Sequence, residues 1–534
     1  MTARRTTLAG GAVALLSAGL LFSPFLKGVP RAFDLKEHLG TAVQVASGLR
    51  GGDSYPRWLA GFNDGWGEAT LVFYPPGLYF AAAGASALLR GDIVTGFFVV
   101  LFLFAAAGAF GLFLFVGRAF GPWAGATASL AFSLVPYRVF ELYDAGLYSA
   151  FAAGSLVPWA LIPLSRLFER EAGGGFPRRS MLAFAGVFAA IVLTNLPTAV
   201  ALAYLVAALL AVQVMVARRL PDALRVIGGG AWGAGIAAVY LVPAAAELGQ
   251  VRVPFTQGRP QFVSNFLFLG SGSWMSPGLR GEFDRMGGAP ALAFLAGLSV
   301  LAVARNRSGS ADPGRERSWV VLVGCIGLAA FFLTTPLSAL AWWLLPFLRN
   351  VNFPWRFLEP LGTAAAGAAA AAGAVLLARR GVSRLLSAVV LPFLIVLAAY
   401  LVAFDLSLAS VNGKMSAAEC RAGLPVFARR EVYFVPKRAR RAAELGPVPL
   451  VACAAPCRAR VLSWEATRRE VEIDAPSATT LYLRTYFFAG WKAVLQDGAR
   501  VPLAVSAEEG TGRLAIADEA YSNCGFTAEV AAMA

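Results

Sequence analysis

The stretch that decides the fold is residues 93–117, which reads IVTGFFVVLFLFAAAGAFGLFLFVG and contains no charged residue. A helix rises ~1.5 Å per residue, so about 20 apolar residues span a bilayer core of ~30 Å. Inside lipid the backbone polar groups must be satisfied within the segment itself, which makes such a run a helix. This stretch therefore predicts a membrane-spanning helix.

Comparable apolar runs recur from residue 8 to residue 401, and 58% of the chain is apolar while only 14% is charged. An ordinary soluble domain has about 25% charged residues. After residue 405 charges return, and residues 469–473 and 481–484 alternate between polar and apolar side chains. That alternation is typical of strands. We expect a mostly α polytopic membrane domain over residues 1–404 and a β-rich domain over residues 405–534.

The net charge of +15 is concentrated in the loops between the apolar runs. Lys and Arg are retained in cytoplasmic loops, so the charge indicates topology and not nucleic-acid binding. Alternation of basic and acidic loops predicts a bacterial inner-membrane protein with a cytoplasmic N-terminus and an extracytoplasmic C-terminal domain. The outer loops are expected at residues 30–92, 138–145, 244–288 and 338–360. About eleven spans are expected near residues 8–27, 93–117, 120–137, 146–165, 181–195, 198–217, 224–243, 289–304, 319–337, 361–378 and 386–404.

Two segments determine whether this alternating in–out topology is possible. Residues 74–89 must not cross the membrane; they are short, and a helix is unlikely to continue upstream through Pro75-Pro76. We read them as an interfacial or re-entrant helix on the outer side. The first apolar run follows Arg4 and Arg5. It is either a cleaved signal peptide or an uncleaved first span, and the many later spans favour the second reading.

Four of the five cysteines lie in the domain predicted to be outside: Cys420, Cys453, Cys457 and Cys524. Disulfides persist outside the cytosol, and four cysteines permit two bridges in three pairings. A zinc site at Cys453 and Cys457 is the alternative, although this domain contains no histidine. Cys325 lies within an apolar run and is most simply a small core residue.

The first outer loop contains the strongest candidates for chemistry. Asp34 and His38 are four residues apart, so they would share one face of a helix. Asp34 could act as a general base toward a hydroxyl group or as a ligand for a divalent cation. His38 is the only histidine of the chain, and structural and catalytic roles are both open for it.

Two later outer stretches contain further charged residues. Glu141 is expected to lie in a solvated loop, whereas Asp144 either caps the next helix or takes part in function. Arg356 lies at an outer surface, where the topology rules do not favour arginine. Its guanidinium suits phosphate oxygens, and snorkelling toward lipid headgroups is the alternative.

The predicted outer loops contain the motifs Tyr55-Pro56-Arg57-Trp58, Tyr74-Pro75-Pro76 and Pro136-Tyr137-Arg138. Together with the acid directly after the first span and the second aspartate, they resemble the GT-C superfamily of integral-membrane glycosyltransferases. The chain also contains Tyr240-Leu241-Val242-Pro243-Ala244, Phe353-Pro354-Trp355-Arg356-Phe357 and, in the outer domain, Tyr486-Phe487-Phe488-Ala489-Gly490-Trp491-Lys492 with Asp497-Gly498. These three stretches resemble the YfhO-like branch, whose members are labelled pyruvoyl-tetrahydropterin-synthase-related. A histidine-built zinc site, which the label would require, cannot be made from one histidine.

The resemblance implies a GT-C-like fold and a sugar donor on a polyprenyl phosphate carrier. It places the catalytic or metal-binding acid at Asp34 and the second acid at Asp144, with Mg²⁺ or Mn²⁺ as the cation that the pair could hold. Arg356 and Arg57 would contact the donor phosphate. Arg138, Tyr74 and Trp355 are further candidates for substrate binding.

Two positions depart from the family pattern. Residues 144–149 read DAGLYS where an Arg-Gly-Ala-x-x-Glu pattern is common, and residues 195–197 read NLP in place of a His-Leu-Pro-like turn. Both changes remove ionisable groups.

The leading hypothesis is transfer of a sugar from the lipid-linked donor to a cell-envelope glycan, lipid or protein on the outer face. A transporter or flippase for a lipid-linked intermediate would need charged residues at mid-membrane depth, and the apolar runs contain almost none. A non-catalytic assembly or glycan-binding scaffold is the third hypothesis, and the two departures favour it.

Overall fold

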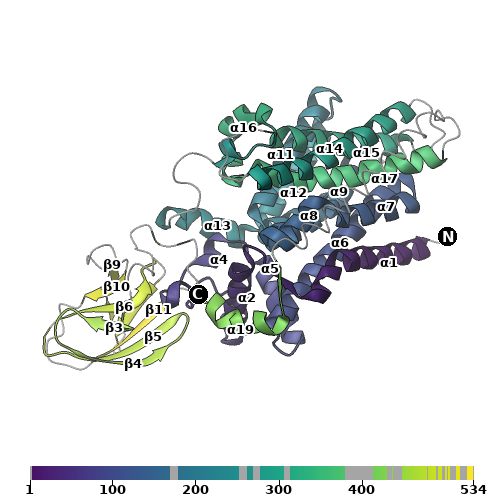
Figure 1. Cartoon of the computed structure of the whole chain (residues 1–534). Helices are drawn as coiled ribbons and strands as arrows, with labels where there is room; N and C mark the ends of the chain where they lie inside the picture. Colours follow the sequence, from purple (N-terminus) through teal and green to yellow (C-terminus); the bar gives the residue numbers. More distant parts are fainter. Residues whose placement is uncertain are drawn as a thin grey trace. The chain divides into compact units, whose positions relative to one another are not determined.

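The computed structural model describes residues 3–168, 178–251, 261–268, 277–305, 313–378, 413–429, 434, 436, 448–477, 479–488, 491–495, 499–501, 503–505, 513–517 and 526–532. The chain divides into two compact units (Figure 1). Unit 1 comprises Met1–Asp34, Phe98–Ala238 and Phe255–Ala417. Unit 2 comprises Leu35–Phe97, Val239–Pro254 and Ala418–Ala534.

Unit 1 is helical. Its helices are α1 (Ala3–Phe22), α6 (Ile93–Phe120, whose first residues belong to unit 2), α7 (Pro122–Ser133), α8 (Pro136–Phe140), α9 (Tyr148–Phe168), α10 (Arg178–Thr194), α11 (Leu196–Met215), α12 (Leu220–Ile236), α14 (Pro277–Arg305), α15 (Pro313–Thr334), α16 (Ala339–Leu344) and α17 (Leu358–Ala378). Shorter turns are η1 (Ser23–Lys27), the π-helical η2 (Glu141–Ala145), η4 (Gln261–Ser264), η5 (Pro336–Ser338), η6 (Leu348–Val351) and η7 (Pro354–Phe357). The strands β1 (Val29–Pro30) and β2 (Lys414–Met415) pair antiparallel.

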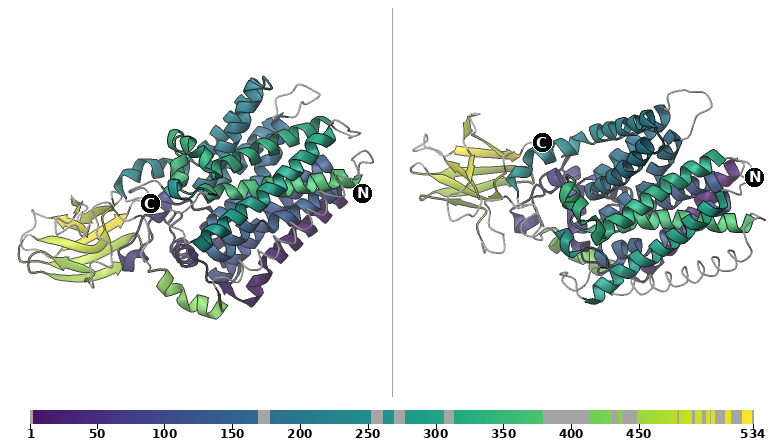
Figure 2. Two further views of the ribbon diagram at one scale, coloured as in Figure 1. Left: turned by 45° about the horizontal axis from the view of Figure 1, so that its top comes forward. Right: turned by 90° about the horizontal axis from the view of Figure 1, so that it is seen from above.

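Small residues let the helices of unit 1 approach closely. The alanine-rich α17 packs against α7, α14 and α15, which run alongside it in the views of Figures 1 and 2. A β-carbon added at Gly297 of α14 would lie 2.7 Å from the Ala368 carbonyl carbon of α17. Such contacts are the usual basis of helix packing in membranes, where apolar side chains gain little by leaving lipid.

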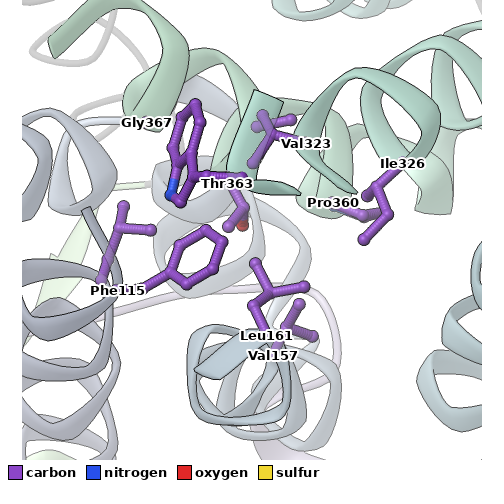
Figure 3. A pocket seen from close by; sticks show the side chains of 11 residues that line it. Phe115, Val157, Leu161, Val323, Ile326, Pro360, Thr363 and Gly367 are labelled. Carbon is purple, nitrogen blue, oxygen red and sulfur yellow. The ribbon is translucent and has the colours of Figure 1, made fainter. Parts of the chain in front are cut away.

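A small void lies between α6, α9, α15 and α17. Phe115, Val157, Leu161 and Val323 surround it together with Thr363 (Figure 3). Its volume of about 10 Å³ is close to the minimum for one water molecule, and its lining is almost wholly apolar. We therefore regard it as a packing defect and not as a binding site.

Seven helices among the described residues are long and apolar enough to cross a membrane, or eight if α12 and α13 (Ala238–Glu247), bent by 73°, form one span. The mostly α class with apolar spans is confirmed, whereas the count of eleven stays a prediction. The predicted span 120–137 is α7, whose 12 residues reach only ~18 Å, so α7 alone is too short. The predicted span 181–195 is α10, with 17 residues. Residues 386–404 lie outside the described residues, as does the domain boundary near 405.

Unit 2 contains most of the segment predicted as the first outer loop, part of α13 and the C-terminal strands. Its helices are α2 (Leu35–Arg50), α3 (Phe62–Gly65, a single turn with left-handed residues), α4 (Thr70–Phe73), α5 (Gly77–Leu88) and α19 (Ala417–Phe427), with the turn η3 (Leu248–Gln250). Its strands are β3 (Val451–Cys453), β4 (Arg458–Trp464), β5 (Arg468–Asp474), β6 (Thr480–Tyr486), β7 (Trp491–Leu495), β8 (Arg500–Val501), β9 (Leu503–Val505), β10 (Arg513–Ala517) and β11 (Phe526–Ala532). The segment predicted not to cross, residues 74–89, contains α5, which has 12 residues and follows the proline pair.

The strands of unit 2 form two antiparallel sheets, ordered β3-β6-β10-β9 and β4-β5-β11-β7-β8. The strands predicted at residues 469–473 and 481–484 are β5 and β6, which confirms the C-terminal β-rich region. Buried side chains of β5, β6 and β7 form one core with Trp58 and Trp66, which precede α5 in the same unit. Gly67 has φ +81°, and a β-carbon there would lie 2.5 Å from the Trp58 ring, so only glycine fits.

The cysteines agree in part with the prediction. Cys453 and Cys457 form a disulfide, which favours the disulfide reading of this pair over the zinc reading. Cys420 of α19 is a buried free thiol, so the prediction that all four cysteines are paired is corrected at this position. Burial raises the pKa of Cys420 to about 11, which keeps the thiol protonated and unreactive. Cys524 lies outside the described residues.

Candidate active site

The segment α8–η2 is the centre of the candidate site in unit 1. Pro136 begins α8, and the chain then forms the π-helical turn Glu141–Ala145, which ends at Gly146 with φ 72°. Single π-turns are rare and often occur at functional sites. The Tyr143 hydroxyl donates to the carbonyl of Leu21 at 2.6 Å, so the turn is fixed to the end of α1.

Two backbone hydrogen bonds join this turn to the segment that carries Asp34. The amide of Phe33 donates to the carbonyl of Asp144 at 2.9 Å, and the amide of Asp34 donates to the carbonyl of Ala145 at 3.0 Å. Asp34 and Asp144 are both partly exposed. The two acids predicted from separate loops are therefore brought to the same place, and both can contact water.

A third acid lies close to this pair. The carboxylate of Asp144 is near enough to Glu282, in the first turns of α14, to repel it electrostatically. The next residue, Phe283, packs its ring 4.9 Å from Phe140 of α8 and 5.1 Å from Trp355 of η7. Aromatic contacts thus connect the acidic residues to the segment that carries Arg356.

Behind the acids lies a buried ion pair between Arg138 of α8 and Glu359 of α17. The second arm of Arg138 donates to the Ser155 hydroxyl at 2.8 Å, and its guanidinium carbon lies 4.1 Å and 4.4 Å from the ring centroids of Phe132 and Phe151. Arg138 is 1% exposed and Glu359 is 3% exposed. Arg138 was predicted to bind substrate; it is buried in this structure, and its two terminal nitrogens are bonded to Glu359 and Ser155.

A glycine at position 154 leaves the space that the Glu359 carboxylate occupies. A β-carbon added at Gly154 of α9 would lie 2.5 Å from the Glu359 carboxylate. Any larger residue at position 154 would therefore displace the carboxylate from Arg138. The glycine is explained by this contact and not by its backbone conformation.

Glu141 lies on the buried side of the turn, so the prediction of a solvated loop at this residue is wrong. It is 1% exposed because the turn places residue 141 toward α17 while residue 144 stays at the surface. Burial, and then repulsion by Glu359, raise the pKa of Glu141 well above its usual range, although Arg138 and Arg356 oppose the shift. Glu141 therefore favours the neutral form.

The segment η7 presents Arg356 next to this buried group. Within residues 353–360 Arg356 is the one residue that remains partly exposed. Its guanidinium carbon lies 5.5 Å from the Phe353 ring centroid and 6.0 Å from that of Trp355. Trp355 itself is buried among aromatic rings, so it supports Arg356 and is not open to a ligand in this structure.

The other predicted residues belong to unit 2. His38 of α2 is buried, its Nδ1 is 2.9 Å from the Tyr79 hydroxyl, and burial lowers its pKa to about 3. The Tyr74 ring lies 6.3 Å from the His38 ring. These contacts favour the structural interpretation of His38, as a neutral ring in an aromatic setting. Asp34 directly precedes α2, so it is not on the helix face that was predicted to carry both residues.

Arg57 is also in unit 2. It is partly exposed, and its guanidinium carbon lies 4.6 Å from the Tyr55 ring centroid, a distance suited to a cation–π interaction. The structure leaves its role in phosphate binding untested.

No group of three or more His, Cys, Asp or Glu side chains in the described part of the chain is arranged to hold a metal ion. Mg²⁺, however, is usually held by one or two carboxylates together with substrate phosphates and water. Asp34 and Asp144 are two carboxylates on segments that the backbone bonds described above join. A divalent cation held by these two residues stays a prediction.

Residues 71–410 match the model of the 6-pyruvoyl-tetrahydropterin synthase related domain, which is described as a membrane protein. The chain belongs to this family. Membership confirms the pyruvoyl-tetrahydropterin-synthase-related resemblance and the assignment to the membrane. No curated protein sequence matches the chain.

Several solved structures are similar to the chain. Arabinofuranosyltransferase AftD from Mycobacteria has a TM-score of 0.48 and 19% identity, covering 77% of this chain and 27% of AftD. The Archaeoglobus fulgidus oligosaccharyltransferase has a TM-score of 0.49 and 14% identity, covering 78% and 57%. ArnT from Cupriavidus metallidurans, bound to undecaprenyl phosphate, has a TM-score of 0.45 and 15% identity, covering 80% and 74%.

These three proteins are GT-C glycosyltransferases. The chain spans about a quarter of the length of AftD and 57% of the oligosaccharyltransferase. Likenesses of this size do not carry an activity from those proteins to this one.

Three residues of the site were not singled out from the sequence: Tyr137, Glu282 and Glu359. Glu359 had a usable signal, because it stands three residues after Arg356 at the start of an apolar run. Ionisable residues at the edge of a span tend to face the protein interior and to pair. Glu282 had no comparable signal, since its sequence neighbours include Arg280, Asp284 and Arg285, as in any solvated loop.

Proposed function

We propose that this chain is a membrane glycosyltransferase that transfers a sugar from a polyprenyl-phosphate-linked donor to a cell-envelope acceptor on the outer face of the membrane. The observation that carries the proposal is the pair of backbone hydrogen bonds that joins the Asp34 segment to the Asp144 turn. Two acids from distant parts of the sequence thereby form one partly exposed acidic rim, which we define as Asp34 and Asp144.

In this proposal Asp34 is the group that accepts the proton of the acceptor hydroxyl. A general base must reach the proton that it removes, and the partial exposure of Asp34 leaves it accessible from water. Asp144 is the second acid, and it keeps the local charge negative. A divalent cation, when bound to the acidic rim and the donor phosphate, would supply electrostatic stabilisation to the leaving phosphate.

Arg356 is the proposed partner of the donor phosphate. It is partly exposed and belongs to the segment that is connected to the acidic rim through Trp355, Phe283 and Phe140. A guanidinium offers a planar set of donors that suits phosphate oxygens. The acids and the phosphate partner are thus carried by neighbouring segments of unit 1.

The proposal is tested by measuring sugar transfer in proteoliposomes that contain the full chain, a polyprenyl-phosphate-linked donor and native envelope acceptor. Asp34→Asn preserves size and removes the charge, so the variant should accumulate in the membrane as wild type does. Its transfer rate should fall by roughly 10²–10⁴-fold, the usual contribution of a general base. Asp144→Asn should have an intermediate effect.

Glu37→Gln is the matched control, because Glu37 is also a partly buried carboxylate just beyond the first span and has no role in the proposal. It should change the rate far less than Asp34→Asn does. Full activity of Asp34→Asn, in the assay or in complementation of a deletion, would rule out the catalytic assignment. The non-catalytic scaffold would then be the better reading.

A further inference from the structure

A small cavity with a mostly apolar lining lies next to Arg356 in unit 1. Five of its lining residues are polar or charged, and they come from α8, η2, α11, η7 and α17. Those five are Tyr137, Glu141, Thr198, Arg356 and Glu359. Its volume of about 20 Å³ exceeds the ~10–15 Å³ that one water molecule requires. A sugar or a phosphate group does not fit in it.

Unpartnered polar atoms surround the cavity. Glu141 Oε2, Arg356 Nε and Glu359 Oε2 are buried and have no hydrogen-bond partner among the residues that the structure describes. Buried polar atoms are almost always bonded either to protein or to water. A water molecule in this cavity would have two to four polar neighbours, as buried waters usually do.

Two arginines lie near Glu141, and their surroundings differ. Arg138 is bound to Glu359 and Ser155 through its two terminal nitrogens, and of the two guanidiniums near Glu141 Arg356 is the one that is partly exposed. The titratable and charged groups that face Glu141 are Tyr137 and Arg138 from α8, Arg356 from η7 and Glu359 from α17. Tyr137 is close enough to Glu141 to interact with it electrostatically.

We propose that Glu141 is a positioning residue for Arg356: through a water molecule in the cavity, its carboxyl group holds the inner edge of the guanidinium and leaves the outer edge free to bind a phosphate. The identity of that phosphate, a polyprenyl phosphate, rests on the proposed function. The cavity, the three unpartnered atoms and the partial exposure of Arg356 do not depend on it.

The neutral form of Glu141 is the one that suits this role. An ionised carboxylate would attract the guanidinium inward and compete with a phosphate for it. A neutral carboxyl can bond to the water without competing for the charge. Burial favours the neutral form, because it raises the pKa of Glu141. Phosphate binding should therefore weaken when the pH is raised far enough to ionise Glu141.

The first test measures binding of a fluorescent polyprenyl phosphate to the full chain in nanodiscs, over a range of pH. Glu141→Gln mimics the neutral form, so it should bind as wild type does near neutral pH and should lose the weakening at high pH. Glu141→Leu should weaken binding about tenfold at every pH, as expected for loss of a hydrogen bond to a charged group. Glu37→Gln should behave as wild type. Equal affinity and the same pH profile in wild type and Glu141→Leu would overturn the proposal.

Inorganic phosphate, added as a competitor, separates the two sources of the ligand. Displacement by inorganic phosphate at the same concentration as polyprenyl phosphate would show that the headgroup alone is recognised. Displacement only at a much higher concentration would show that the lipid chain also contributes to binding. Both results support the positioning role, provided that Glu141→Leu weakens the binding that is observed.

A second measurement needs no ligand. The infrared band of a protonated carboxylic acid, identified by its loss in Glu141→Gln, should persist to higher pH in Arg356→Gln, because Arg356 stabilises the ionised form of Glu141. No change in the pH at which the band disappears would refute the coupling, even if the protein binds no polyprenyl phosphate. Failure to bind the lipid, with the band shifted as expected, would instead contradict only the proposed function.

Discussion

The two ends of the short segment α8–η2 provide the most informative comparison in the molecule. At one end Arg138 is 1% exposed and paired with Glu359. Six residues later Asp144 is partly exposed and lies beside the Asp34 segment. These ten residues therefore include one charged side chain that is buried and paired and one that is partly exposed to water.

The difference teaches how to separate structural from catalytic charges. A buried charge is costly to leave without its partner, so its loss should appear mainly as instability. A partly exposed carboxylate is solvated with or without its neighbours, so its loss should appear mainly in chemistry. Buried charges of unit 1 should therefore affect folding, and the acidic rim should affect turnover.

The largest effect on stability should come from Arg138→Met. This variant removes the guanidinium and leaves the Glu359 carboxylate buried without its partner, which should destabilise the protein by about 3–5 kcal/mol. The measurement is thermal or denaturant unfolding of the purified protein in detergent. Asp144→Asn, measured in the same way, should lie close to wild type.

The double variant Arg138→Met with Glu359→Leu is the control for that prediction. Replacing both members of a buried pair by apolar groups is often neutral, so this variant should recover most of the lost stability. An equally unstable double variant would mean that packing, and not the unpaired charge, explains the effect of Arg138→Met.

Glu68 of unit 2 sharpens the comparison, because it is a buried carboxyl that pairs with no arginine among the described residues. It accepts hydrogen bonds from Asn63, Thr70 and the amide of Phe434 at 2.9–3.2 Å. Burial raises its pKa from 4.5 to about 7 in spite of these bonds.

Because the folded-state pKa lies above the unfolded value, the folded protein holds the proton more tightly. Stability should therefore be greatest below pH 4.5 and should fall as the pH rises to about 7, by ~3 kcal/mol in total from this group. Glu68→Gln should remove this dependence from unfolding curves measured across that range. An unchanged pH profile in Glu68→Gln would show that Glu68 does not titrate in the predicted window.

The smallest effect should come from the disulfide between Cys453 and Cys457. It closes a very short loop, with a sequence separation of 4, so replacing both cysteines by serine should cost about 2 kcal/mol. Unfolding of the double-serine variant measures this cost.

Mass spectrometry without reduction should find Cys420 alkylated only after unfolding; rapid alkylation of the native protein would contradict its burial.

Much of the fold follows from local sequence. Residues 93–117 form a helix because their backbone has no other way to bond within lipid, and residues 469–473 form a strand because their polarity alternates. The positions of Asp34 and Asp144 outside the long apolar helices could also be predicted, since each lies beyond the end of an apolar run. These features depend on a few neighbouring residues, so a single sequence reveals them.

The buried cluster could not be predicted in the same way. Glu141 reads as a loop residue, and only the π-helical turn and the packing of α9 and α17 place it inside. Gly154 shows why: the space for Glu359 depends on a residue 205 positions earlier in the chain. Pairing over such separations leaves no local pattern, and it needs the three-dimensional structure.

The central claim, that Asp34 and Asp144 act as one catalytic rim, is tested most directly by a double-mutant cycle on the transfer rate. The rate is measured for wild type, Asp34→Asn, Asp144→Asn and the variant that carries both changes. Groups that act as one unit are not additive, so the double variant should be only about threefold slower, or less, than Asp34→Asn alone. A loss equal to the product of the two single losses would show that the two acids act independently and would contradict the account.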